Sequence, residues 1–304
     1  MNYNKDFSII IPHRNSVELL PTLFKTIPNN KNIEIIVIDN STPFITKNDI
    51  GINRDYTLIF SAPERGAGGA RNEGLKIANG KWIIFIDADD YFTENAWKAF
   101  YQFLDSDCEI IHFKEKGVFI DTGEMAPQRG RNQCLRVDNF LKDKSTEWSL
   151  RLQWNCPVCR MIKLDLIKRN NIKFDEVIAS NDVMFALLAG FYAKKVDAFD
   201  EYVYVATVNK GSLTRRRDYD VILSRFLVTL RYNKFLKEHG FPQFQNSIMN
   251  FYSQSINFGF KAWFYFTKLL LQYKQNPFIG ISRWKKTYTK RKSLLLKEKQ
   301  YIVK

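Results

Sequence analysis

The sequence is poor in the features that mark exported and membrane-spanning proteins. It has 4 cysteines in 304 residues, without regular spacing, which is typical of proteins from a reducing compartment. The first ten residues lack the basic start, the long apolar run and the cleavage site of a secretory signal. No run of about 18 uncharged apolar residues occurs, so a spanning helix is not expected. These absences predict a cytoplasmic protein.

The sequence does contain enough apolar residues for a sizeable core, and its charged residues are unevenly distributed along the chain. Hydrophobic residues make up 45% and aromatic residues 15% of the chain, which suits one large domain or two small ones. Residues 215–304 hold 19 Lys and Arg against 4 Asp and Glu, whereas the rest holds 27 against 28. This shift predicts a domain boundary near Gly211–Asp218, between a domain of residues 1–214 and a basic, aromatic, helical region of residues 215–304.

Short apolar runs alternate with helix-like segments over the first ninety residues. The runs are rich in Ile and Val, as in strands buried on both faces of a sheet. Strand and helix in alternation predict an α/β fold with a parallel sheet, in which ligands bind at the carboxyl ends of strands. Asp39 and Asp87 stand at such ends. The expected strands are residues 7–12, 33–39, 56–60 and 82–87, and the expected helices are 16–27 and 68–78.

Three aspartates lie within four positions at the end of the last of these strands, in Asp87–Asp90. Carboxylates one residue apart at a strand end can turn toward one point, and their oxygens suit Mg²⁺ or Mn²⁺ that also holds a diphosphate. The alternative is a solvated acidic turn that leads into a helix capped by Thr93. The acidic pattern by itself leaves both interpretations open.

A glycine-rich segment, Glu64–Gly74, precedes this strand. It is not a dinucleotide fingerprint, because Arg71 stands where a third glycine is needed, and it is not a P-loop, because Leu75 replaces the lysine. A glycine-rich helix start with a cation still suits a nucleotide or a phosphate. The alternative is a closely packed turn.

Taken together, these motifs resemble the nucleotide-sugar half of the inverting glycosyltransferases of family 2. The resemblance implies a GT-A fold, with a Rossmann-like, mostly parallel central sheet flanked by helices, and a helical C-terminal extension. It divides the first domain into a nucleotide-sugar half, residues 1–105, and an acceptor half, residues 106–214. The resemblance rests on four segments in the family's order, SIIIPHRN, IEIIVIDNST, GGARNEGL and WIIFIDADDYF.

The resemblance assigns roles to several of these residues. Asp39 would bond the base or ribose of the nucleotide, and Arg71 would also face the base. Asp89 would ligate Mn²⁺ or Mg²⁺, while Asp87 would reach the ribose, the metal or a metal-bound water. Asn40 departs from the family pattern, which has a second acid there. The positions that the resemblance implies for the nucleotide are Pro12, Arg14, Asp39, Arg71 and Asp87.

An inverting transfer also needs a base that takes the proton of the acceptor hydroxyl. In the resemblance this base is the aspartate of an acidic pair that opens a helix, which corresponds here to Asp182, with Asn181 in place of the glutamate. Ser180 is expected to cap this helix, whose dipole would stabilise the anion. The alternative is that Asp182 only favours a helix start. Further on, Lys210 would substitute for an arginine that the family often carries.

The segment Trp154–Cys159 contains a CxxC pair. Zinc sites usually need a second pair at similar spacing, which Cys108 and Cys134 do not provide, so zinc or redox chemistry is disfavoured. The resemblance places Trp154 beside the acceptor pocket, where its ring would stack on a sugar. Packing in the core is the alternative for this tryptophan.

The C-terminal region combines aromatic residues with positive charge. Residues 256–278 are crowded with rings and residues 283–299 with cations, a composition typical of helices that lie on anionic lipid. The resemblance to enzymes that act on lipid-linked sugars fits a peripheral contact with the inner face of the membrane. The alternative is that the apolar part packs on the protein. The sequence has no recognition module for nucleic acid, so that partner is not expected.

These observations predict a metal-dependent, inverting glycosyltransferase. It would move a sugar from a nucleotide diphosphate sugar, with a UDP-sugar as the first expectation, to a hydroxyl of a glycan or lipid-linked glycan in cell-surface polysaccharide synthesis. A sugar-nucleotide nucleotidyltransferase is the first alternative, but it needs a glycine- and lysine-rich phosphate loop that SIIIPHRN does not supply. A non-catalytic membrane or nucleic-acid binding protein is the second alternative.

Overall fold

The computed structural model describes residues 3–208 and 216–279, which form two compact units. The first unit comprises residues 3–177 and 181–208, and the second comprises residues 178–180 and 216–279. The boundary predicted at residue 214 falls outside the described residues. Within them, no helix has the length and apolarity that crossing a membrane requires.

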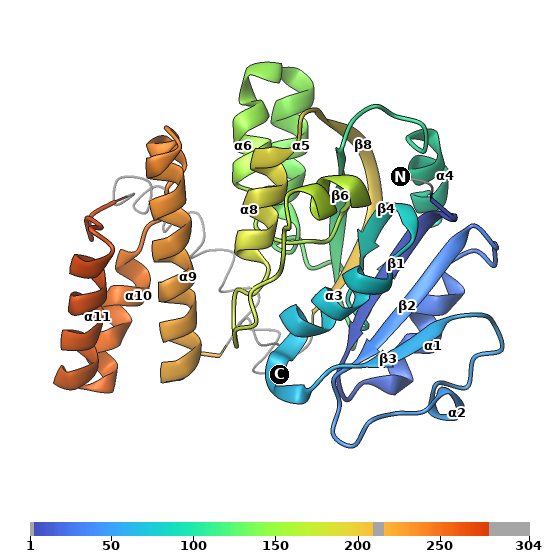
Figure 1. Ribbon diagram of the computed structural model, residues 1–304, viewed down its shortest axis with the longest axis horizontal. Coiled ribbons are helices and arrows are strands. Elements are labelled where there is room, and N and C mark those ends of the chain that lie inside the picture. The colour runs from blue at the N-terminus through green and yellow to red at the C-terminus, as the bar shows by residue number, and fades with distance from the viewer. Residues whose placement is uncertain (1–2, 209–215, 280–304) are drawn as a thin grey trace. The chain divides into compact units, whose positions relative to one another are not determined.

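The first unit is built on one eight-stranded mixed sheet with the strand order β3-β2-β1-β4-β7-β6-β8-β5 (Figure 1). The first four strands pair in parallel, as their alternation with helices predicts. The short strand β7 is antiparallel to both of its neighbours, which makes the sheet mixed. The strands are β1 (Lys5–His13), β2 (Ile33–Asp39), β3 (Thr57–Phe60), β4 (Gly80–Phe85), β5 (Tyr91–Phe92), β6 (Ile110–Phe119), β7 (Arg160–Lys163) and β8 (Val196–Val208).

Helices cover both faces of this sheet, which confirms the α/β expectation. Successive strand residues point to opposite faces, so Ile9 and Ile11 join one core cluster and Ile10 joins the other. The first cluster packs against α1, α4, α5 and α6, and the second against α3, α7 and α8. The helices are α1 (Leu20–Lys25), α2 (Lys47–Ile50), α3 (Gly66–Ile77), α4 (Ala96–Gln102), α5 (Arg131–Lys142), α6 (Glu147–Leu152), α7 (Leu164–Arg169) and α8 (Val183–Tyr192).

The helix after the acidic cluster begins later than the sequence predicts. Thr93 was expected to cap it, but α4 starts at Ala96, and the residue before its first turn is Asn95. The Thr93 hydroxyl instead donates a hydrogen bond to the carbonyl oxygen of Tyr202 on β8. The threonine therefore joins this segment to the sheet, and the prediction of a cap was wrong.

The second unit is helical, as the sequence of this region predicts. Its helices are α9 (Tyr219–Glu238), α10 (Met249–Gln254) and α11 (Phe260–Gln272). The rings of Phe226 and Phe266 stack at 4.6 Å between α9 and α11. Other residues of α11 point away from this core, and Phe260 and Leu271 are 83% and 75% exposed. One face of α11 therefore packs, whereas another meets solvent.

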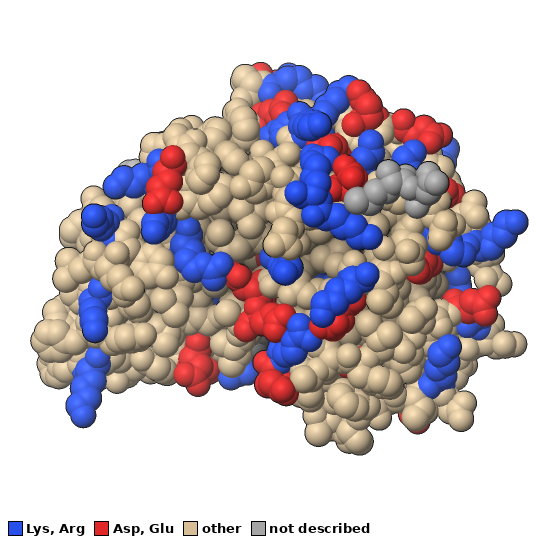
Figure 2. All heavy atoms as spheres, in the orientation of Figure 1, with Lys and Arg blue, Asp and Glu red and all other residues tan. Residues whose placement is uncertain are grey.

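Charged side chains on the described surface are of both signs and are interspersed (Figure 2). Many of them form ion pairs in the first unit, such as Arg169 with Glu109 and Lys195 with Asp107. Much of the positive excess of the chain lies instead in residues 280–304, which are outside the described residues. On the face shown, the described residues thus form no large patch of only positive or only negative charge.

Candidate active site

The structure separates the three aspartates that follow β4. Asp90 is buried, and its carboxylate accepts hydrogen bonds from the Tyr204 hydroxyl and, at 2.7 Å, from the Thr207 backbone N–H. Asp87 and Asp89 are only half-buried. Asp90 therefore anchors the turn to β8, whereas Asp87 and Asp89 are more exposed; their predicted role as a metal-binding pair stays a prediction.

Arg71 connects this cluster to a segment more than one hundred residues away. Its Nη2 donates to Asp87 Oδ1 at 2.6 Å, and its Nη1 donates to Asn181 Oδ1 at 3.0 Å. The guanidinium also lies 5.4 Å from the ring centre of Phe174. Arg71 is buried, so these contacts hold it in one position. Its predicted contact with a nucleotide base stays a prediction.

The glycine-rich start of α3 serves close packing. A Cβ on Gly68 would lie 2.0 Å from the carbonyl oxygen of Asp175, so only glycine lets the segment before α8 approach the helix. Asn72 then pins this segment, because its side chain donates to the Phe174 carbonyl and accepts from the Phe174 N–H at 3.0 and 2.9 Å. At Gly68 this confirms the interpretation as a closely packed turn.

Asp182 lies at the start of α8, where the sequence predicts the base. Ser180 does not cap this helix, because the residue before its first turn is Asp182, while Ser180 has the positive φ of 61°. Desolvation raises the pKa of Asp182; Arg71 opposes this shift most strongly, and Asp87 adds to it. The structure therefore brings Arg71, Asp87 and Asp182 within electrostatic reach of one another, a feature typical of functional sites.

Asp39 ends β2 and is fully buried beside β1. Its carboxylate accepts from the Ile45 N–H at 2.8 Å and from the Ser41 N–H at 3.1 Å, and it pairs with His13 Nδ1 at 2.9 Å. Burial alone would raise the pKa of Asp39, but these hydrogen bonds lower it overall. Asp39 thus shapes the loop after β2, and its contact with the nucleotide stays a prediction.

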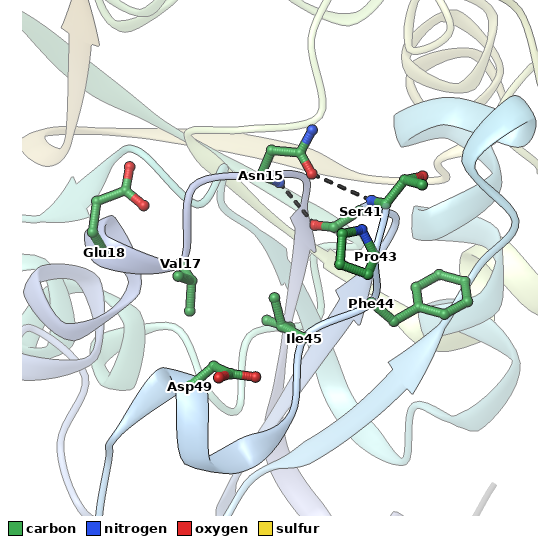
Figure 3. A pocket seen from close by; sticks show the side chains of 9 residues that line it. Asn15, Val17, Glu18, Ser41, Pro43, Phe44, Ile45 and Asp49 are labelled. Carbon is green, nitrogen blue, oxygen red and sulfur yellow. Dashed lines mark hydrogen bonds between the residues drawn. The ribbon is translucent and has the colours of Figure 1, made fainter.

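A pocket of about 350 Å³ lies beside this loop, at the carboxyl ends of β1 and β2. Asn15 and Ser41 join its two walls, since the Asn15 N–H donates to Ser41 Oγ at 2.8 Å. In Figure 3 these two residues lie at the top, Asp49 lies at the bottom, and Val17 and Ile45 lie between them. Two other predicted residues lie on either side of His13, the last residue of β1; Pro12 is half-buried and Arg14 is exposed.

Trp154 belongs to the core. It is fully buried, its ring centre lies 4.5 Å from that of His112, and its Nε1 donates to the Val158 carbonyl at 3.3 Å. It has no surface for an acceptor sugar, so that prediction was wrong and the packing alternative is confirmed. Cys156 and Cys159 follow it as free cysteines.

Sequence reasoning missed several residues of the cluster. Tyr204 and Thr207 bind Asp90 from β8, and Glu115 and Arg129, on β6 and in the loop that follows, interact electrostatically with Asp87. No local pattern marks these residues, because their proximity arises only when β6 and β8 pair. Lys210, which was expected to replace a family arginine, lies outside the described residues.

The comparisons with known proteins agree with this geometry. A family model described as Glycosyl transferase family 2 matches residues 8–170, more than half of the chain. The chain belongs to this family. The match begins in β1 and ends just after α7, so it includes Arg71, Asp87 and Asp89.

Two curated relatives of this family 2 chain are bacterial proteins. It is 28% identical over 217 residues to a poly(ribitol-phosphate) beta-glucosyltransferase of Bacillus spizizenii, a match that covers 67% of this chain and 32% of that protein. This chain thus spans about a third of the length of that relative. It is 25% identical over 226 residues to UDP-Glc:alpha-D-GlcNAc-diphosphoundecaprenol beta-1,3-glucosyltransferase WfaP of Escherichia coli, which covers 73% of this chain and 81% of that protein.

Solved structures confirm the GT-A fold. Staphylococcus aureus TarS 1–349 in complex with UDP-GlcNAc matches with a TM-score of 0.64 and 20% identity, over 88% of this chain and 81% of that one. Mannosyltransferase PcManGT from Pyrobaculum calidifontis, in complex with GDP-Man and Mn²⁺, matches with a TM-score of 0.57 and 14% identity, over 100% and 90%.

The donor set of the family 2 site suits a divalent metal ion. Asp87 and Asp89 offer carboxylate oxygens, the ligands that Mg²⁺ and Mn²⁺ prefer, and Arg71 occupies only one oxygen of Asp87. Across residues 3–208 and 216–279, no three His, Cys, Asp or Glu side chains gather as a complete metal site. Mg²⁺ is commonly held in proteins by one or two carboxylates together with substrate phosphates.

Proposed function

We propose that this chain is an inverting glycosyltransferase that uses a UDP-sugar as donor and a hydroxyl of a glycan or lipid-linked glycan as acceptor, in cell-surface polysaccharide synthesis. The observation that carries the proposal is the bridge made by Arg71. Its bonds of 2.6 and 3.0 Å join Asp87 of the acidic pair to Asn181, the neighbour of Asp182. An inverting transfer needs a site for the diphosphate and a base close to each other, and this bridge places the two candidates together.

In this proposal Asp182 accepts the proton of the acceptor hydroxyl while the oxygen attacks the anomeric carbon. The bond between that carbon and the diphosphate breaks, and UDP departs with the bonding electrons. Asp87 and Asp89 would hold Mn²⁺ or Mg²⁺, which stabilises the charge that develops on the leaving diphosphate. Arg71 keeps Asp87 oriented and favours the anionic form of Asp182.

We place the nucleotide at the carboxyl ends of β1 and β2. Ligands of open α/β sheets bind outside these ends. The 350 Å³ pocket next to Asp39 has amide and carboxylate groups at its walls, among them Asn15 and Asp49, that can read the polar edge of a base. Pro12 lies on β1 and Arg14 directly follows this strand, so the five residues predicted for the nucleotide lie at or just after strand ends or on α3.

We also propose a peripheral contact of α11 with the inner face of the membrane. Phe260, Phe264 and Leu271 are 83%, 64% and 75% exposed, and Lys261 and Lys268 stand among them in the sequence. Such a combination binds anionic lipid surfaces. The protein is expected to sediment with phosphatidylglycerol vesicles at low salt and to do so less after Phe260→Ser with Phe264→Ser. Equal sedimentation of both proteins contradicts this contact.

Slow hydrolysis of UDP-sugars tests the proposed function. The purified chain with Mn²⁺ is expected to release UDP from its preferred UDP-sugar in the absence of acceptor, because water can replace the acceptor hydroxyl. Chromatography of the products distinguishes the alternatives: a nucleotidyltransferase releases pyrophosphate, and a binding protein releases nothing. A thermal-shift screen of nucleotide sugars identifies the donor beforehand, since a bound ligand stabilises the fold by mass action.

A further inference from the structure

The loop after β6 is fixed against that strand at two glycines. A Cβ on Gly117 would lie 2.3 Å from Cβ of Arg129, and a Cβ on Gly130 would lie 2.2 Å from Cγ of Glu115. Gly130 also has the positive φ of 74°, which favours glycine. The Ala126 N–H donates to the Gly117 carbonyl at 2.8 Å, and the Arg129 N–H donates to the Ala126 carbonyl at 3.0 Å. The backbone of Arg129 is thereby held on β6.

The pairing of β6 with β8 brings this arginine to the acidic cluster. Glu115 lies opposite Tyr204, whose hydroxyl binds Asp90, and Gly117 lies opposite Ala206. Desolvation alone would lower the pKa of Arg129, but Glu115, Asp90, Tyr204 and Asp87 raise it overall. Arg129 therefore lies within electrostatic reach of Asp87 and of Asp90, which anchors the cluster to β8.

Arg129 differs from Arg71 in the contacts of its guanidinium group. Arg71 is buried and donates to two side chains, whereas Arg129 is exposed to solvent and its guanidinium has no hydrogen bond or ion pair with the described residues. A planar guanidinium matches two oxygens of a phosphate. An anion that an acidic pair holds through a metal ion also needs cationic neighbours, and Arg129 is a cation within electrostatic reach of this cluster.

We propose that Arg129 is a further donor-binding residue, whose guanidinium binds phosphate oxygens of the diphosphate held at Asp87 and Asp89. This rests on the proposed function, because it takes a nucleotide diphosphate as the ligand of the aspartate pair. The loop glycines Gly117 and Gly130 act indirectly, by holding Arg129 on β6. The sequence motifs predict the donor site from the first ninety residues alone. The assignment adds to this site a residue from the middle of the chain.

Titration of UDP and of uridine with Mn²⁺ present tests the proposal, since uridine lacks the diphosphate. Arg129→Met is expected to weaken UDP binding at least about tenfold and to leave uridine binding within about twofold. Arg131→Met is the matched control, because Arg131 is an exposed arginine two residues away; this variant should bind UDP like the unaltered protein. Gly117→Ala, which displaces Arg129 without removing its charge, should also weaken UDP binding.

The outcomes separate the two levels of the proposal. If the unaltered protein does not bind UDP, the proposed function fails. If it binds UDP and Arg129→Met binds it equally well, only the role of Arg129 is overturned. If Arg129→Met and Arg131→Met weaken UDP binding equally, the effect comes from the general positive charge. The role of Arg129 is then also overturned. Farnesyl diphosphate serves as a probe for a lipid-linked diphosphate; weakened binding of this probe with unchanged UDP binding overturns the assignment to the donor.

Discussion

The substitution Asp182→Asn is expected to lower kcat for sugar transfer about 10²- to 10⁴-fold while the affinity for UDP changes less than about twofold. Asparagine has nearly the size of aspartate, so it should fit the half-buried position before α8. Its amide cannot take the proton of the acceptor hydroxyl. Steady-state transfer rates and a UDP titration with Mn²⁺ measure the two effects separately.

Asp105→Asn is a suitable control for Asp182→Asn, because it removes a carboxylate of the same unit whose side chain is 92% exposed. It should leave both quantities unchanged. A loss of UDP affinity in Asp182→Asn as large as the loss of rate would contradict the role of a base.

The pH dependence of transfer is a separate test of Asp182. Because desolvation raises the pKa of Asp182, transfer should fall with decreasing pH through a value above the usual range of an aspartate near 3.9.

The substitution Asp89→Asn is expected to weaken the Mn²⁺-dependent binding of UDP by at least about tenfold. Loss of a group that only orients a metal ligand already costs about 10- to 100-fold in metal affinity, so loss of a ligand should cost no less. Asp89 is half-buried and forms no ion pair with the described residues, so the fold does not depend on its charge. Calorimetric titration of UDP into protein with saturating Mn²⁺ measures the change.

Chelation of the metal provides the control for Asp89→Asn. With EDTA the unaltered protein should bind UDP as weakly as Asp89→Asn does, because both then lack the shared ion. If the difference between the two proteins persists in EDTA, Asp89 contacts the nucleotide directly and the metal assignment is wrong. Asp90→Asn is not a useful control, because the carboxylate of Asp90 is buried against Tyr204 and Thr207 and its loss disturbs the fold.

Much of the first unit was predictable because its signals are local. Ile and Val in runs of five or six residues predict buried strands, and the structure places Ile9 and Ile10 on opposite faces of the sheet, each in a core. Strand ends can be read in the same way, which explains why Asp39 and Asp87 were expected at one edge of the sheet. Capping was harder, since Thr93 and Ser180 have the right side chains but the wrong backbone positions.

The sequence by itself thus determined the α/β class and the parallel start of the sheet, since both depend on neighbouring residues, whereas the roles of Asp87, Asp89 and Asp182 stay predictions. The tertiary structure alone decided that Asp90 turns inward to β8 and that Gly68 serves packing. It alone decided that Arg71 bridges two motifs. The residues in these contacts are far apart in the sequence. They meet only because distant strands pair and α3 packs on the sheet, which no local sequence pattern predicts.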